Sequence, residues 1–285
     1  MAKIVALYFK AYRMKNENKN KKDNLLIKIV ITLLTFLALI VIAIPFSKYF
    51  LIASHTHTAE VKIHTEMPKK IPTAQPIKAP SLQSAIAGAQ NSKNSDGTMN
   101  QYAIGQVVIP KVSINQPIFV GLTDENMTYG VVSLFPNRAP DKSSLTLIGH
   151  HGGNWLQWGY WLLFGGIQQL NKGDSVYVRY MNDYYEYKVE KNTIIKATDT
   201  DLLANKGPNY IFLVTCNQST ETPYRVLVTA KKVKNVNTQK IKSSFENSTH
   251  ELTQKNTKRY TTEFILPLII TLIIACAFLI FIWRL

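Results

Sequence analysis

Three side chains that could share one reaction stand at or beside the ends of strand-like segments. Cys216 and His150 each close an apolar run, and Arg225 opens the run that follows the cysteine. A thiolate can attack an acyl carbon, an imidazole can carry a proton to the leaving amine, and a guanidinium can hydrogen-bond the developing oxyanion. Because the strands of a barrel end on a common rim, residues that are far apart in sequence can converge there.

Each of these residues also has a purely structural interpretation. Cys216 is the only cysteine outside the C-terminal apolar run that contains Cys276. On a domain facing an oxidising exterior, a lone thiol cannot pair within its own domain, so it is either buried and inert or kept for its reactivity. Taken alone, a cysteine in an apolar strand is more often a packing residue. The chemical interpretation therefore depends on the three residues together.

Two apolar segments frame the chain. The first covers residues 25–46, and its cleanest part, 29–46, would form about 27 Å of helix. The second, residues 264–283, carries no charge. Each is long enough to cross a bilayer of about 30 Å, which predicts two transmembrane helices rather than buried core helices. The first also lacks a small-x-small cleavage pattern and is too long for a signal peptide, so we expect an uncleaved anchor.

The charges that flank the first segment predict its orientation. Residues 1–24 hold seven basic side chains against two acidic ones, which favours a cytoplasmic N-terminus and an extracellular domain between the spans. Residues 231–259 hold eight basic against two acidic side chains and would prefer the cytoplasm. Long translocated loops largely escape this rule, so the N-terminal charges carry more weight.

The net charge of +15 does not indicate a nucleic-acid-binding protein. Between residues 101 and 230 the chain holds ten basic and ten acidic residues, so the predicted folded domain is neutral. The excess positive charge lies in the tails beside the apolar segments. This distribution favours a membrane partner, through anionic lipids and cell-envelope polymers, over nucleic acid.

The segments on either side of the predicted domain are polar. Residues 47–100 are rich in proline and small polar residues and predict an extracellular stalk, with one helical piece near 81–90. His55, His57 and His64 in this stalk have no cysteine, aspartate or second-shell pattern that would indicate a metal site. Residues 233–263 predict a polar, basic tether.

Residues 101–232 have the pattern of short strands separated by turns, which predicts an all-β barrel or sandwich. Turn residues occur at 171–174 and 181–183. The expected strands are 104–109, 114–120, 145–149, 175–180, 184–195, 210–216 and 224–230.

The run Phe-Leu-Val-Thr-Cys at 212–216, the pair Gly149-His150 and the downstream Arg225 resemble the motifs of the sortases. These are Gram-positive cell-surface transpeptidases whose signature is Thr-Leu-x-Thr-Cys. Phe212 replaces the first threonine, which exchanges one β-former for another. The resemblance covers about residues 81–230 and is strongest to the class A type.

The resemblance implies an eight-stranded β-barrel that acts as a thiol transpeptidase without a cofactor. Cys216 would attack the Thr-Gly carbonyl of an LPXTG-type sorting signal, and His150 would protonate the leaving glycine amine. Arg225 would stabilise the oxyanion and the bound substrate, and Thr215 would contact the substrate. An amine, typically that of a lipid II or peptidoglycan cross-bridge, would then release the thioacyl enzyme.

Several features depart from the family pattern. His151 follows His150 and should point to the opposite face of the strand, so we assign the catalytic role to His150, which occupies the family position. Residues 130–144 hold a single acidic residue, Asp141, so we expect no calcium or other metal. The second apolar segment is typical of the pilin-polymerising class C, although the sequence has no Asp-Pro-aromatic lid.

Two alternatives therefore stay open beside a class A-like enzyme. One is a pilin polymerase, and the other is a surface scaffold with two anchors and an inert cysteine. The L,D-transpeptidases are disfavoured because their Ser-x-Gly-Cys signature is absent.

Two further segments have roles that one sequence does not decide. Trp155, Trp158, Trp161 and Phe164 fit core packing, a wall of the substrate groove or contact with the membrane surface. Residues 196–209 lie where sortases form a loop that recognises substrate.

Overall fold

The structure is a computed structural model, and it describes residues 2–58, 61–91, 99–152 and 161–284. The chain divides into two compact units. One unit combines Met1–Phe46 with Ile265–Leu285, and the other is Ser47–Phe264. The second unit contains every residue that the sequence nominates for chemistry.

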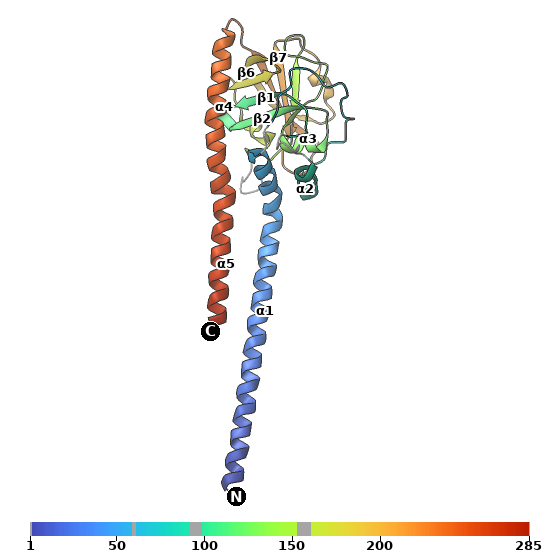
Figure 1. Cartoon of the computed structure of the whole chain (residues 1–285). Helices are drawn as coiled ribbons and strands as arrows, with labels where there is room; N and C mark the ends of the chain where they lie inside the picture. The colour runs from blue at the N-terminus through green and yellow to red at the C-terminus, as the bar shows by residue number, and fades with distance from the viewer. Residues whose placement is uncertain (1, 59–60, 92–98, 153–160, 285) are drawn as a thin grey trace. The chain divides into compact units, whose positions relative to one another are not determined.

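A closed β-barrel forms the centre of the second unit (Figure 1). Its strand order is β1-β2-β3-β4-β7-β8-β6-β5. Neighbouring strands run antiparallel except for the pairs β2–β3 and β4–β7, which are parallel. The strands are β1 (Ala103–Ile109), β2 (Ile114–Val120), β3 (Val131–Ser133), β4 (Leu145–Ile148), β5 (Ser175–Tyr180), β6 (Asp183–Lys196), β7 (Tyr210–Cys216) and β8 (Tyr224–Lys232).

The barrel interior is filled by aliphatic and aromatic side chains from all parts of the sheet. On β5, Val176, Val178 and Tyr180 are buried, whereas the residues between them are partly exposed. This alternation is what a strand with one inward face produces. In contrast, β4 is buried along its whole length, because both of its faces are covered.

The barrel confirms the all-β fold expected from the sequence. The bounds of β2, β5 and β7 are the predicted ones, and the other expected strands end within two residues of their predicted limits. Strand β3 was not predicted, because three residues are too few to show a period. Both expected turns are present, with left-handed backbone at Gly173 (φ 95°) and Met181 (φ 54°).

A short helix, α3 (Asp124–Tyr129), was also absent from the sequence-based prediction. Thr123 caps it, since its hydroxyl accepts a hydrogen bond from the Asn126 amide at 3.2 Å. Asp124 and Glu125 occupy the first turn, where negative charge favours the helix dipole. These signals were present in the sequence and could have revealed the helix.

Residues 61–80, which follow α1 (Ala2–Thr58), lie along the barrel surface. The His64 amide donates to the Ala103 carbonyl, and the Gln75 amide donates to the Leu122 carbonyl, both at 2.8 Å. We call residues 68–80 the strap. The helical piece expected near 81–90 is α2 (Leu82–Asn91), which lies close to α3 (Figure 1).

The segment after the barrel, where the sequence predicted a polar tether, contains helix α4 (Thr238–Tyr260). Asn237 caps it, because its side-chain oxygen accepts from the Gln239 amide at 2.8 Å. Phe245 and Leu252 are buried and pack with Val108 of β1. Figure 1 shows α4 running beside β1, β2 and β6. The buried apolar stripe of α4 consists of few residues, such as Phe245 and Leu252. The rest of the segment is polar, so its composition predicted a tether and not a packed helix.

The first unit contains the apolar helical stretches of the chain and the basic N-terminal residues. Two helical stretches are long and apolar enough to cross a membrane, one at Asn24–Ile44 and the other within Thr238–Arg284. In the second, a π-helical turn, η4 (Thr261–Ile265), leads into α5 (Leu266–Arg284). Large apolar side chains on both stretches are exposed, for example Leu33 at 63% and Ile274 at 64%. Such surfaces suit contact with lipid.

Candidate active site

Cys216 and Arg225 are neighbours across an antiparallel strand pair. Cys216 is the last residue of β7, and in the register of β7 with β8 it lies opposite Arg225. Residues directly opposite each other in such a pair present their side chains on the same face, with Cβ atoms about 5 Å apart. The register therefore holds the thiol and the guanidinium together.

His150 reaches the same place from the other side of β7. Strand β4 runs parallel to β7, with Ile148 opposite Val214, and the Gly149 amide donates to the Val214 carbonyl at 3.1 Å. A Cβ at Gly149 would lie 2.7 Å from Cβ of Phe164, so no side chain fits there. The chain thus delivers His150 beside the end of β7.

One pocket contains all three residues that the sequence nominated. Its lining consists of Ile77, Met127, Ile148, Gly149, His150, Thr215, Cys216 and Arg225. His150 is 2% exposed, whereas Cys216 and Arg225 are partly exposed. The barrel therefore brings a thiol, an imidazole and a guanidinium from three strand ends to one small space.

His151 lies elsewhere, as expected for adjacent residues on opposite faces. Its ring packs on η2 (Phe164–Gln169), where a Cβ at Gly165 would lie 3.0 Å from its Cδ2 atom, and it interacts with Gln168. Burial lowers the pKa of His151. It is absent from the lining of the Cys216 pocket, so the geometry favours His150 for chemistry.

The surroundings keep the thiol and the imidazole uncharged at neutral pH. Burial raises the pKa of Cys216, although the Arg225 guanidinium acts in the opposite direction. Burial lowers the pKa of His150 to about 4, and the positive charge of Lys48 adds to this effect. The resting state is therefore a thiol beside a neutral imidazole, and a thiolate–imidazolium pair is a minor state.

The guanidinium of Arg225 is oriented by the backbone around it. Its Nη1 atom donates to the carbonyls of Thr222 at 2.6 Å and Tyr224 at 2.9 Å. Its Nε and Nη2 groups make no hydrogen bond with other residues that the structure describes. A guanidinium offers five N–H donors, so the side chain can be held by its own loop while it donates to a second group.

The chain is similar in sequence to a protein family and to individual relatives. Residues 107–233 match the model of the sortase domain. Sortase A of Listeria monocytogenes is 28% identical over 171 residues, which cover 60% of this chain and 71% of that protein. Sortase A of Bacillus anthracis is 29% identical over 125 residues, covering 44% of this chain and 57%, less than two thirds, of that protein.

The barrel is a sortase domain. Sortases are cysteine transpeptidases, and the domain belongs to that class of enzyme. Among solved structures, that of Listeria monocytogenes sortase A aligns with a TM-score of 0.42 and 28% identity, covering 46% of this chain and 88% of that one. A sortase C-1 from Streptococcus pneumoniae aligns with a TM-score of 0.41 and 23% identity, covering 47% and 68%.

Thr215 of the sortase domain lines the Cys216 pocket, and its hydroxyl is buried. The residue is 1% exposed, and its Oγ1 atom has no hydrogen-bond partner among the described residues. Adjacent residues of a strand point to opposite faces, so this hydroxyl lies on the other face of β7 from the Cys216 thiol. The expected contact between Thr215 and substrate stays a prediction.

Two apolar residues that the sequence did not nominate close the pocket. Ile77 belongs to the strap and Met127 to α3, and between them and the strand ends there is essentially no free volume. The strap is held by Gln75, whose side-chain oxygen also accepts from the Asp124 amide at 3.1 Å. An extended peptide can enter this site only if the strap or α3 moves.

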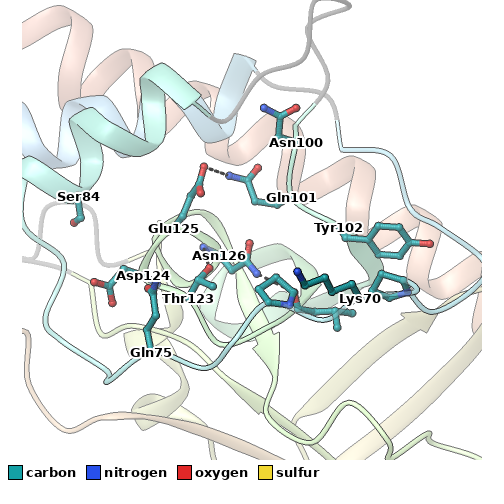
Figure 2. Close-up of a pocket in the computed structure, with 13 residues that line it drawn as sticks. Lys70, Gln75, Ser84, Asn100, Gln101, Tyr102, Thr123, Asp124, Glu125 and Asn126 are labelled. Atoms are coloured by element: carbon teal, nitrogen blue, oxygen red, sulfur yellow. Dashed lines mark hydrogen bonds between the residues drawn. The ribbon is translucent and has the colours of Figure 1, made fainter.

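A larger cavity of about 590 Å³ lies between the strap, α2 and the start of α3 (Figure 2). Gln101 donates to Glu125 there at 2.9 Å, and burial raises the pKa of that carboxyl. The cavity shares no lining residue with the Cys216 pocket. We assign the acyl chemistry to the smaller pocket, because it holds the nucleophile, the imidazole and the guanidinium.

The remaining candidate residues fall into different environments. Phe164 is part of the core, and Trp161 donates through Nε1 to Glu263 at 2.9 Å, whereas Trp155 and Trp158 lie outside the described residues. The loop at 196–209 contains η3 (Thr200–Leu203), and Arg138 donates to its Leu203 carbonyl at 2.8 Å. The role of that loop in recognition stays a prediction.

The stalk histidines contact aromatic rings. His55 packs on Tyr129 with ring centroids 4.3 Å apart, and His64 stacks on Tyr102 at 3.9 Å. The side chain of His57 lies outside the described part of the chain. The absence of a metal requirement stays a prediction.

Proposed function

We propose that this protein is a membrane-anchored sortase that joins surface proteins to a cell-wall precursor. In this proposal the enzyme cleaves the Thr-Gly bond of an LPXTG-type sorting signal and transfers the threonine carbonyl to an amine of lipid II or peptidoglycan. The observation that carries the proposal is the convergence of Cys216, His150 and Arg225 in one pocket.

The first half of the reaction forms a thioester. The Cys216 thiolate attacks the threonine carbonyl carbon, and the carbonyl oxygen becomes an oxyanion that Arg225 stabilises through its Nε–H and Nη2–H groups. When the intermediate collapses, the C–N bond breaks, and the glycine nitrogen takes the proton of the His150 imidazolium. The products are a thioacyl enzyme, a free glycine amine and a neutral imidazole.

The second half reverses these roles. The acceptor amine attacks the thioester carbonyl, neutral His150 accepts the proton that the amine loses, and the C–S bond breaks to restore the Cys216 thiolate. The same imidazole thus serves as acid and then as base. The exclusion of water by the strap would favour the amine over hydrolysis.

Two apolar helices support anchoring in a membrane on both sides of the sortase domain. The basic N-terminus supports the expectation that the domain is extracellular. The C-terminal helix also supports the alternative of a pilin polymerase, which differs only in using a pilin lysine as the acceptor.

Incubation of the full chain in detergent with an LPXTG peptide and one amine at a time tests the proposal. We expect an amide product that joins the threonine carboxyl to a cross-bridge-type glycine amine, and much less product with a lysine-containing pilin peptide. A preference for the pilin lysine would establish the polymerase alternative. Absence of cleavage with every amine, in a folded protein, would refute a sortase reaction on this motif.

A further inference from the structure

A separate, basic pocket of about 210 Å³ lies at the end of α4. Its charged lining comprises Lys111, Lys255, Arg259 and Glu263. Lys111 comes from η1 (Pro110–Val112), the turn that joins β1 to β2, and the other three come from the last turns of α4 and from η4. The pocket shares no residue with the Cys216 pocket.

Packing fixes the elements that carry these charges. Asn256 of α4 donates through Nδ2 to the Ser113 carbonyl at 3.2 Å, and the neighbouring Leu252 is 2% exposed. Ser113 has left-handed backbone (φ 58°), and its amide closes η1 on the Pro110 carbonyl at 3.2 Å. The cations of the pocket therefore stand on a docked helix and on a tight turn, and they are not scattered on a mobile surface.

The three cations of this pocket outnumber its one carboxylate, that of Glu263. None of the three forms an ion pair with any residue that the structure describes. The Glu263 carboxylate instead accepts from the indole of Trp161. Lys255 and Arg259 are four residues apart on one helix, where like charges repel. An anion bound between the cations would remove that repulsion.

The covalent chain keeps this pocket near the membrane. The chain is helical from Arg259 to Phe264, where the uncharged apolar segment of residues 264–283 begins, and these five steps rise about 7 Å. In a bilayer, polar headgroups flank the hydrocarbon by about 5 to 8 Å on each side. If α5 spans the membrane, Arg259 stands at the level of the lipid phosphates. Tryptophan, such as Trp161, is favoured at the same level.

We propose that this pocket binds the phosphate of an anionic membrane lipid. Arg259 presents a planar fork that matches two phosphate oxygens, while Lys111 and Lys255 act as point charges from two sides. The bound lipid would tie α4 and the β1–β2 turn to the membrane surface. This proposal does not depend on the transpeptidase reaction.

Competition between lipids on the full chain in detergent tests this site. Native mass spectrometry would count the phosphatidylglycerol and phosphatidylcholine molecules retained from an equimolar mixture. We expect the wild type to prefer phosphatidylglycerol. Arg259→Gln and Lys255→Gln should each weaken phosphatidylglycerol binding about fivefold, as expected for one cation near a lipid phosphate.

Lys258→Gln is the matched control. It removes the same charge from the same turn of α4, but Lys258 does not line the pocket, so lipid binding should change less than about twofold. Thermal melting would show that all variants are folded. An equal loss in the control would overturn the proposal in favour of diffuse attraction, and so would an absence of preference in the wild type.

A competition with inorganic phosphate distinguishes a lipid site from a site for free phosphate. Inorganic phosphate lacks the acyl chains that hold a lipid beside Arg259, so an amount equal to the lipid should leave the lipid bound. Displacement of phosphatidylglycerol by that amount of inorganic phosphate would overturn the lipid assignment and leave a site for free phosphate.

Discussion

At the scale of single residues, a substitution of Arg225 tests the stabilisation of the oxyanion while the nucleophile Cys216 is left in place. Removing one donor to an oxyanion typically costs about 3 to 4 kcal/mol in the barrier. We therefore expect Arg225→Ala to fold but to cleave an LPXTG peptide about 100- to 1,000-fold more slowly than the wild type. Steady-state cleavage rates with the full chain in detergent would measure this.

Arg225→Lys is the matched variant for this prediction. It keeps the positive charge but loses the fork that lets Nη1 bind its own loop while other N–H groups serve the substrate. Its rate should lie between those of the wild type and Arg225→Ala. If Arg225→Ala cleaves at nearly the wild-type rate, the guanidinium has no part in the transition state.

The burial of His150 predicts how stability depends on pH. Its pKa is about 4 in the folded protein and about 6.5 when unfolded, so the unfolded state binds more protons between these values. Stability from this group is complete above pH 7 and is lost as the pH falls toward 4. At pH 4.5 the loss is about 2 kcal/mol, or about 4 to 8 °C in melting temperature.

His150→Gln provides the comparison, because glutamine does not titrate. Thermal melts of both full-length proteins at pH 7 and pH 4.5 would show a smaller acid-induced decrease in the variant. The buried His151 is present in both proteins, so its contribution cancels. An equal decrease in both would mean that His150 is not held neutral by burial.

At the scale of elements, the strap controls access to the thiol. Ile77 lines the Cys216 pocket and packs against a cluster of buried apolar residues that includes Phe212 and Leu227. Replacing it with serine removes about 1 kcal/mol or more of apolar burial, which raises the open population about fivefold. In a Cys276→Ala background, alkylation of Cys216 should accelerate by that factor.

Ile71→Ser is the control for the strap. Ile71 lies in the same segment but is 41% exposed and does not line the pocket. Its alkylation rate should match that of the parent protein. Equal rates for all three proteins would show that the strap does not limit access.

The elements also show what could be predicted from the sequence and what could not. Strands such as β5 alternate apolar and polar residues, and β7 is a continuous apolar run, so their periods revealed them. The placement of His150, Cys216 and Arg225 followed from strand ends and from the resemblance to a family. Strand periods, strand ends and family motifs are properties of short stretches of sequence, so they can be recognised without the structure.

The features that were missed depend on contacts between distant segments. Ile77 lies in a proline-rich stretch with no period, and only the hydrogen bonds of Gln75 to Leu122 and Asp124 place it over the site. Likewise, α4 was read as a tether because its apolar stripe is sparse. The effect of Lys48 on His150 joins α1 to a residue about 100 positions away, which no local pattern reports.

At the scale of the whole molecule, the excess of basic residues in the N-terminus predicts that the N-terminus is cytoplasmic and the sortase domain extracellular. In a background without cysteines, Lys172→Cys in a barrel turn should react with a membrane-impermeant maleimide on intact cells. Asn20→Cys, in the basic N-terminus, should react only after the cells are permeabilised, because positive residues are retained in the cytoplasm. The reverse labelling pattern would place the sortase domain inside the cell and exclude a cell-wall substrate.

The most direct test of the central claim is the mass of the enzyme after a brief reaction with an LPXTG peptide and no amine acceptor. We expect the full chain to gain the mass of the peptide up to its threonine, as a thioester located on Cys216 by fragmentation. Cys216→Ala, with the same fold, should gain nothing. An acyl group on another residue, or unchanged cleavage by Cys216→Ala, would contradict catalysis by this thiol.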